Sequence, residues 1–185
     1  MDDSHSDDDD RSMDKQHLLA AWGVTVTLAY LLTQILGRSG HSAVWPILGL
    51  WTAAMAVPLW MTWSARQRGA DVGKLSALWV GLVVVTMVEN ALATGFAGES
   101  VTHFSYRTLW FAVGAVGFAL TAAWVEGGAR KAAYGLWALA NAAAVVGLLV
   151  AYGSFEGWAF VLAAGIQGLP MLVDLPLRAR QKAKT

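Results

Sequence analysis

Six long apolar stretches, joined by short polar connections, are the feature that most constrains the fold of this chain. They cover residues 18–36, 43–63, 75–96, 108–125, 132–152 and 158–173. A helix rises about 1.5 Å per residue, so about 20 apolar residues cross the hydrocarbon core of a bilayer. The sequence therefore predicts an all-α fold, a polytopic bundle of six transmembrane helices.

The small number of charged residues indicates that lipid, not water, surrounds most of the chain. Only 14% of the 185 residues are charged, whereas soluble domains carry about 25%. Seven of the 13 acidic residues lie within the first 14 positions, and a block of like charge favours disorder. We therefore expect a disordered acidic tail over 1–16, a six-helix transmembrane domain over 17–177 and a basic tail over 178–185.

The lysine and arginine residues predict how the bundle is oriented. Of the 13, only Arg38 and Arg107 lie in the first, third and fifth connections, and all others lie in the tails and the remaining connections. Basic residues are enriched in cytoplasmic loops. Both termini are therefore predicted to be cytoplasmic, in a multi-pass protein of the cell membrane whose first partner is the lipid bilayer.

Several classes of function are disfavoured by composition and motifs. The net charge is zero and cysteine is absent, so we expect no nucleic-acid partner and no thiolate metal site. The acidic start does not resemble a signal peptide; without cysteine, it fits a salt-adapted organism. Neither a metalloprotease motif nor a phosphate-binding loop is present, and no histidine lies in a span. We therefore expect no metal, no cofactor and no catalytic residue, and the chain is not expected to be an enzyme.

Glu89 is the only ionisable residue well inside a predicted span. A charged group in hydrocarbon costs about 3 kcal/mol even on lenient scales, so Glu89 should face the bundle or a water-filled pocket. A carboxyl group in such a pocket can exchange a proton or bind a cation. The alternative is a structural carboxyl group that hydrogen-bonds to a neighbouring helix.

Other polar residues are candidate binding groups around Glu89. They are Gln34, Asn90, Arg107, Asn141 and Gln167. Arg107 opens the fourth span on the side nearer Glu89, and an ion pair between the two would explain both charges. Asn141 and Gln167 lie near the middle of their spans, where amide side chains most often hold helices together.

Tryptophan, proline and small residues predict how the helices pack. Six of the ten tryptophans lie near span ends, as in an interfacial belt: Trp45, Trp60, Trp63, Trp110, Trp124 and Trp158. Trp51, Trp79 and Trp137 lie deeper and favour core packing over a cavity wall. Ala164 and Gly168 are spaced for close helix approach, and Pro170 is expected to kink its helix and leave a carbonyl free.

The segment 104–111, Phe-Ser-Tyr-Arg-Thr-Leu-Trp-Phe, resembles the start of the fifth helix of microbial (archaeal) rhodopsins. Residues 28–32, Pro58 and the ending 177–180 are also compatible with that family. The resemblance implies the family's fold without its first helix. The last span has no lysine to bind retinal, the second span lacks the family's aspartates, and alanines at 142–144 replace an aromatic residue, so the resemblance does not imply light-driven pumping.

Three functions remain open from the sequence. The leading hypothesis is a protein that transports or senses a small solute or a proton through a polar pocket around Glu89. The second is a non-catalytic membrane subunit with an assembly, sensory or lipid-organising role, in a homo-oligomer or with another membrane protein. The third is an intramembrane enzyme acting on a lipid or isoprenoid, which bound lipid near Glu89 would support.

Overall fold

The computed structural model describes residues 4–38, 44–67, 73–96 and 104–174. These residues form helices and no strand. The long helices are α1 (Ser4–Gly37), α2 (Val44–Gln67), α3 (Gly73–Phe96), α5 (Trp110–Trp124) and α6 (Gly128–Val150). The π-helical turn η2 (Phe104–Leu109) leads into α5, and the short α7 (Tyr152–Phe155) and η3 (Glu156–Trp158) follow α6.

The last helix covers Ala159–Asp174 and is called the C-terminal helix below. It begins as α8 (Ala159–Ala163) and passes through the π-helical segment η4 (Ala164–Gly168) before an α-helical end. At about 1.5 Å per residue it is about 24 Å long. This described length is less than the roughly 30 Å of a typical hydrocarbon core.

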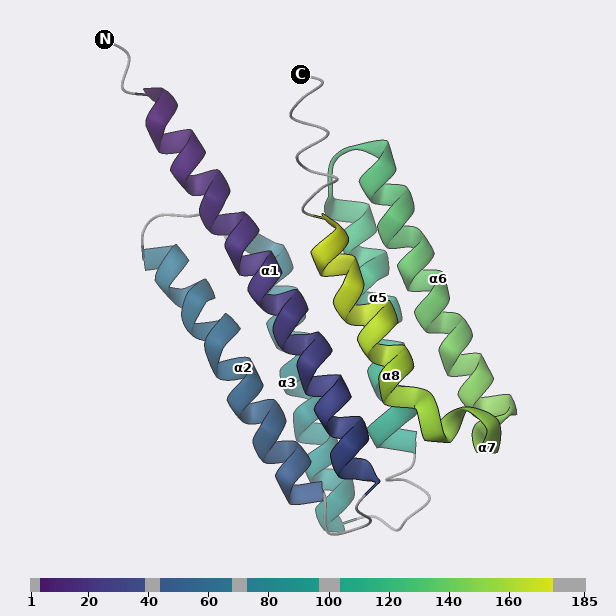
Figure 1. The fold of residues 1–185 in the computed structure, drawn as a ribbon. Helices are drawn as coiled ribbons and strands as arrows, with labels where there is room; N and C mark the ends of the chain where they lie inside the picture. The colour runs from purple at the N-terminus through teal and green to yellow at the C-terminus, as the bar shows by residue number, and fades with distance from the viewer. Residues whose placement is uncertain (1–3, 39–43, 68–72, 97–103, 175–185) are drawn as a thin grey trace.

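Among the described residues, five helical segments are long and apolar enough to cross a membrane. They are Ala20–Gly37, Trp45–Gln67, Leu75–Leu92, Arg107–Trp124 and Gly128–Val150. The all-helical fold and the first five apolar stretches are therefore confirmed as helices, whereas the sixth stretch forms a helix shorter than the other five. The helices alternate in direction, so that the start of α1, the α5–α6 connection and the Asp174 end of the C-terminal helix lie at one end of the bundle (Figure 1). We call this the tail end.

The acidic segment at the start of the chain differs from the sequence-based expectation. Helix α1 begins at Ser4, so most of residues 1–16 lie in a continuous helix that runs on into the first apolar stretch. Serine and aspartate are favourable at the start of a helix, because they cap free N–H groups and complement the positive end of the helix dipole. The expected C-terminal tail lies outside the described residues.

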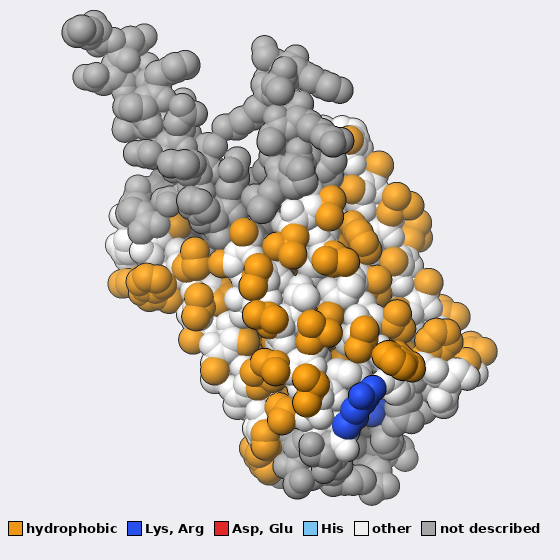
Figure 2. All heavy atoms as spheres, in the orientation of Figure 1, with side chains coloured by type: hydrophobic (Ala, Val, Ile, Leu, Met, Phe, Trp, Pro, Cys, Tyr) orange, Lys and Arg blue, Asp and Glu red, His pale blue; other side chains and the backbone are white. Residues whose placement is uncertain are grey.

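The surface of the bundle is apolar over most of its length. Side chains such as Val85, Leu139 and Val150 are at least 65% exposed. Figure 2 shows apolar side chains spread over the described part of one face, where one patch of Lys or Arg also lies. Large exposed apolar areas of this kind mark a surface that lipid or another protein covers, so the structure supports an integral membrane protein.

Two tryptophan–threonine hydrogen bonds join helices at different depths of the bundle. Trp51 Nε1 on α2 donates to Thr33 Oγ1 on α1 at 3.0 Å. Trp79 Nε1 on α3 donates to Thr121 Oγ1 on α5 at 3.2 Å. Each indole N–H thereby finds an acceptor inside the bundle, as a buried donor requires. Both tryptophans contribute to packing as the sequence indicated, and Trp51 also lines the cavity described below.

An ion pair closes the tail end of the bundle between α6 and the C-terminal helix. Arg130 Nε lies 2.8 Å from Asp174 Oδ1, and Arg130 Nη2 lies 3.1 Å from Asp174 Oδ2. The two side chains are 12% and 2% exposed. Two parallel hydrogen bonds of this kind fix both position and orientation, so the pair anchors the C-terminal helix.

The Asp174→Asn substitution is therefore expected to lower the stability of the bundle by about 2 kcal/mol, because it removes the charge that compensates a mostly buried guanidinium. Thermal unfolding in detergent, followed by circular dichroism, measures this effect. Glu126→Gln is the matched control, because Glu126 is exposed in the adjacent α5–α6 connection. Equal melting temperatures for the parent and both variants would contradict the anchoring role.

Candidate functional site

Gln167 is the centre of a buried polar network that joins four parts of the bundle. Tyr30 on α1 donates its hydroxyl proton to Gln167 Oε1 at 2.5 Å. Gln167 Nε2 donates to Asn141 Oδ1 on α6 at 2.8 Å and to the backbone oxygen of Trp110 on α5 at 3.0 Å. All of these residues are buried. The network therefore holds α1, α5, α6 and the C-terminal helix together.

The proline in the C-terminal helix explains one further partner of Asn141. Pro170 has no N–H to donate to the carbonyl of Ile166, four residues earlier. Asn141 Nδ2 lies 3.4 Å from that carbonyl oxygen and 2.9 Å from the oxygen of Trp137. The free carbonyl expected from Pro170 is thus contacted by an amide on another helix, and the π-helical segment η4 accommodates the altered backbone.

Gly114 on α5 leaves room for the side chains of this network. A Cβ atom on Gly114 would lie 2.5 Å from Asn141 Oδ1 and 2.7 Å from Gln167 Nε2. A side chain at position 114 would therefore displace the hydrogen bond between Asn141 and Gln167. Only glycine lets α5 approach the two amides this closely.

Aromatic rings cover the network on the side away from the tail end. The rings of Trp51 and Trp110 are stacked, with centroids 4.7 Å apart. Tyr30 meets Trp51 edge-on at 4.8 Å and Trp110 edge-on at 6.0 Å, and lies against Phe160 at 6.4 Å. Offset-stacked and edge-on pairs are the favoured aromatic arrangements, so these four rings form a well-packed wall.

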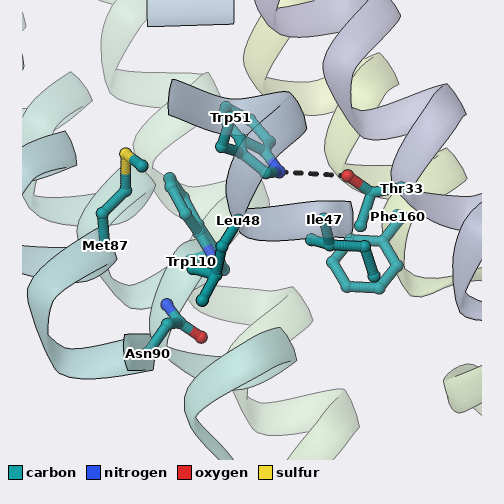
Figure 3. A pocket seen from close by; sticks show the side chains of 8 residues that line it. All are labelled: Thr33, Ile47, Leu48, Trp51, Met87, Asn90, Trp110 and Phe160. Atoms are coloured by element: carbon teal, nitrogen blue, oxygen red, sulfur yellow. Dashed lines mark hydrogen bonds between the residues drawn. The ribbon is translucent and has the colours of Figure 1, made fainter. Parts of the chain in front are cut away.

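A small cavity lies against this wall. The centre of a water-sized sphere can move within it over about 10 Å³. The described residues that line it are Thr33, Ile47, Leu48, Trp51, Met87, Asn90, Trp110 and Phe160. Figure 3 shows the indole of Trp110 between Met87 and Trp51, with the carboxamide of Asn90 beside it. The cavity is therefore mostly apolar, with a carboxamide and a hydroxyl group on its wall.

The candidate site residues from the sequence divide into separate groups. Asn141 and Gln167 are hydrogen-bonded to each other, which supports their expected role in holding helices together. Asn90 lines the cavity. Gln34 donates from Nε2 to the backbone oxygen of Gly157 at 3.0 Å and so ties the end of α1 to η3.

Glu89 and Arg107 lie on neighbouring elements. Glu89 is partly buried on α3, directly before Asn90, and is not among the residues that line the cavity. Arg107 is partly buried in η2, which packs against α3. Each of these two side chains has an interaction partner in the structure. The ion pair between Glu89 and Arg107 stays a prediction.

One tryptophan expected in the interfacial belt is instead part of the core. Trp110 is 6% exposed, whereas the other five belt candidates are between 49% and 69% exposed. The assignment of Trp110 to the belt was wrong, because the helix already begins at Phe104 with η2, which places Trp110 one to two turns inside it. Tyr30 was missed altogether as a polar residue of the bundle centre, although a lone tyrosine within an apolar stretch signals a buried hydroxyl that requires a partner.

These features define a helical membrane protein with a buried amide network and a small aromatic-walled cavity. Comparison of the chain with protein-family models, curated proteins and solved structures gave no match. Among the described residues, no group of three histidine, aspartate or glutamate side chains is placed to hold a metal ion. The function is therefore inferred from the residues and geometry of the site.

Proposed function

We propose that this chain is a six-span protein of the cytoplasmic membrane, with both termini inside, that binds a small solute in its cavity and moves or senses it. The alternating directions of the helices and the common end of α1 and the C-terminal helix support an even number of crossings. The basic residues support the orientation. The cavity then lies in the outer half of the membrane.

The cavity is the observation that carries this proposal. Its wall combines side chains from α1, α2, α3, α5 and α8. Small-molecule sites are typically apolar, concave and formed between helices, with few polar groups. Asn90 supplies such a group, and the next residue back along α3 is Glu89, the candidate proton or cation carrier.

Transport would require Glu89 in addition to the cavity. We expect the Glu89→Gln variant, reconstituted in liposomes, to lose at least about tenfold in proton or solute flux, because the amide cannot ionise. The measurements are the fluorescence of an enclosed pH dye under an applied proton gradient and light scattering after an osmotic step. Glu126→Gln, which changes an exposed carboxyl group at the opposite end of the bundle, should keep the parent rate. Parental flux no faster than in protein-free liposomes, or equal flux in all variants, would contradict transport.

A non-catalytic membrane subunit is the second candidate. It is favoured by the hydrogen bonds that engage Asn141 and Gln167 in helix packing and by the small size of the cavity. This function predicts that crosslinking in native membranes captures a second membrane protein and that Glu89→Gln leaves the complex intact. Kinship with microbial rhodopsins, suggested by residues 104–111, is a further proposal that implies no retinal here.

A further inference from the structure

We infer that Arg38 and Trp158 bind the phosphate of an anionic phospholipid, and that a hydrocarbon chain of this lipid lies along an exposed apolar stripe of α1. The stripe consists of Leu28, Leu31 and Ile35. The site lies at the end of the bundle away from the tail end, which faces the outer leaflet in the orientation proposed above. Only this choice of leaflet rests on the proposed function, because lipid binding at the site requires no transport.

Arg38 presents its positive charge at the surface of the bundle. It is exposed directly after the end of α1, and its Cζ lies 5.9 Å from the centre of the Trp158 ring. Trp158 is itself 60% exposed. A guanidinium is attracted to the face of an aromatic ring, and the N–H groups in its plane can still bind an anion. The pair therefore offers oriented hydrogen-bond donors to an anion at the surface.

A contact between two elements holds the ring of Trp158 beside Arg38. Gln34 lies one turn before Arg38, and its Nε2 donates to the backbone oxygen of Gly157 at 3.0 Å. Gly157 and Trp158 are consecutive residues of η3. This hydrogen bond fixes η3 against the end of α1, so the fold itself brings the ring and the guanidinium together.

The depth and chemistry of the site favour a lipid phosphate. Exposed tryptophans of membrane proteins lie at the level of the lipid headgroups, where the phosphate groups also lie. The planar guanidinium of arginine can donate two parallel hydrogen bonds to one phosphate. Figure 2 shows a patch of Lys or Arg beside the apolar face, at the end away from the tail end. A positive charge therefore lies at the depth at which a phospholipid is negative.

The apolar stripe of α1 runs from this site into the membrane. Leu28, Leu31 and Ile35 are 53%, 38% and 63% exposed. Residues three, four or seven positions apart share one face of a helix, and Arg38 continues this row two turns after Leu31. From Leu28 to Arg38 the helix rises about 15 Å, which is about half of a typical hydrocarbon core. The stripe therefore matches the length of a lipid chain in one leaflet and ends where the phosphate would lie.

Native mass spectrometry of the full chain, released from detergent with phosphatidylglycerol added, tests this site. We expect Arg38→Gln to weaken binding of the first lipid at least about tenfold, because it removes the charge-assisted hydrogen bonds to phosphate. Arg66→Gln is the matched control, because Arg66 is an exposed arginine at the opposite end of the bundle, and it should bind like the parent. Trp158→Leu should weaken binding by a smaller factor, because it removes only the ring that orients the guanidinium. Thermal melting followed by circular dichroism verifies that each variant is folded.

Two further probes separate the lipid from its parts. Diacylglycerol has the chains without the phosphate, and inorganic phosphate has the anion without the chains. Neither should displace phosphatidylglycerol at equal concentration. Ile35→Asn should weaken binding of phosphatidylglycerol, whereas Val85→Asn, at a similarly exposed position on α3, should not.

Three results would overturn the inference. They are equal binding by the parent and Arg38→Gln, equal weakening by Arg38→Gln and Arg66→Gln, and displacement of the lipid by inorganic phosphate. The flux measurements proposed above are independent of these results. Lipid bound at Arg38 in a protein without flux would refute only transport, and flux without such binding would refute only the lipid site.

Discussion

The Gly168→Ala substitution is expected to destabilise the bundle by about 3 kcal/mol. A Cβ atom at this position would lie 1.9 Å from Thr27 Oγ1 and 3.2 Å from Thr27 Cα. The contact with backbone means that a change of rotamer alone cannot relieve the clash, so α1 and the C-terminal helix must move apart. Overpacking of a close-packed interior typically costs about 1–3 kcal/mol, and occasionally more. Unfolding of the purified protein by titration with SDS, followed by circular dichroism, measures the loss.

Gly165 provides a matched control on the same π-helical segment. A Cβ atom there would meet nothing within 4 Å, so Gly165→Ala should be neutral or stabilise the helix slightly. Thr27→Ala should partly rescue Gly168→Ala, because it removes the closest atom while leaving Cβ at 3.0 Å. If Gly165→Ala and Gly168→Ala unfolded at the same SDS fraction, close approach of the two helices would not limit stability.

Replacement of Gln167 by leucine is expected to cost about 2–4 kcal/mol. The change leaves the buried hydroxyl group of Tyr30 and the buried oxygen of Asn141 without their present partner. A buried polar group that loses its hydrogen bond costs about 1–3 kcal/mol. The same SDS titration measures the effect, and the transition should also broaden if the C-terminal helix detaches before the rest.

A double-mutant cycle with Tyr30→Phe isolates the hydrogen bond between Tyr30 and Gln167. Interhelical hydrogen bonds in membrane proteins average about 0.6 kcal/mol and reach about 1.7 kcal/mol. We expect a coupling near the upper value, because both groups are fully surrounded by protein. A coupling indistinguishable from zero would mean that the network does not hold α1 to the C-terminal helix.

The positions of the helices could be predicted from the sequence because a helix that crosses lipid requires a long apolar stretch. Long apolar stretches and short polar connections mark each helix, and the ends of the first five agree with the structure to within a few residues. The close packing at Gly168 also followed from the spacing of small residues. The helical start at Ser4 did not follow from the sequence. A run of like charges predicts repulsion and disorder, whereas in the structure one continuous helix includes both the acidic segment and the apolar stretch that follows it.

The arrangement of the polar groups depended on rotation of each helix, which a single sequence does not specify. Asn141 and Gln167 were expected to hold helices together, but not to contact each other or Tyr30. The two π-helical segments changed the register at Trp110 and Gln167, and no residue pattern marked them in advance. Asn90 and Glu89 are adjacent in sequence, yet only Asn90 lines the cavity.

The most direct test of the account is the side of the membrane on which each connection lies. Because the chain has no cysteine, single cysteines can be introduced by Glu126→Cys, Ser154→Cys and Thr185→Cys and treated with a membrane-impermeant maleimide in intact cells and in lysed membranes. Six crossings predict that only Ser154→Cys reacts in intact cells and that all three react after lysis. Reaction of Ser154→Cys and Thr185→Cys from the same side would show that the C-terminal helix does not cross, and would contradict the six-span account.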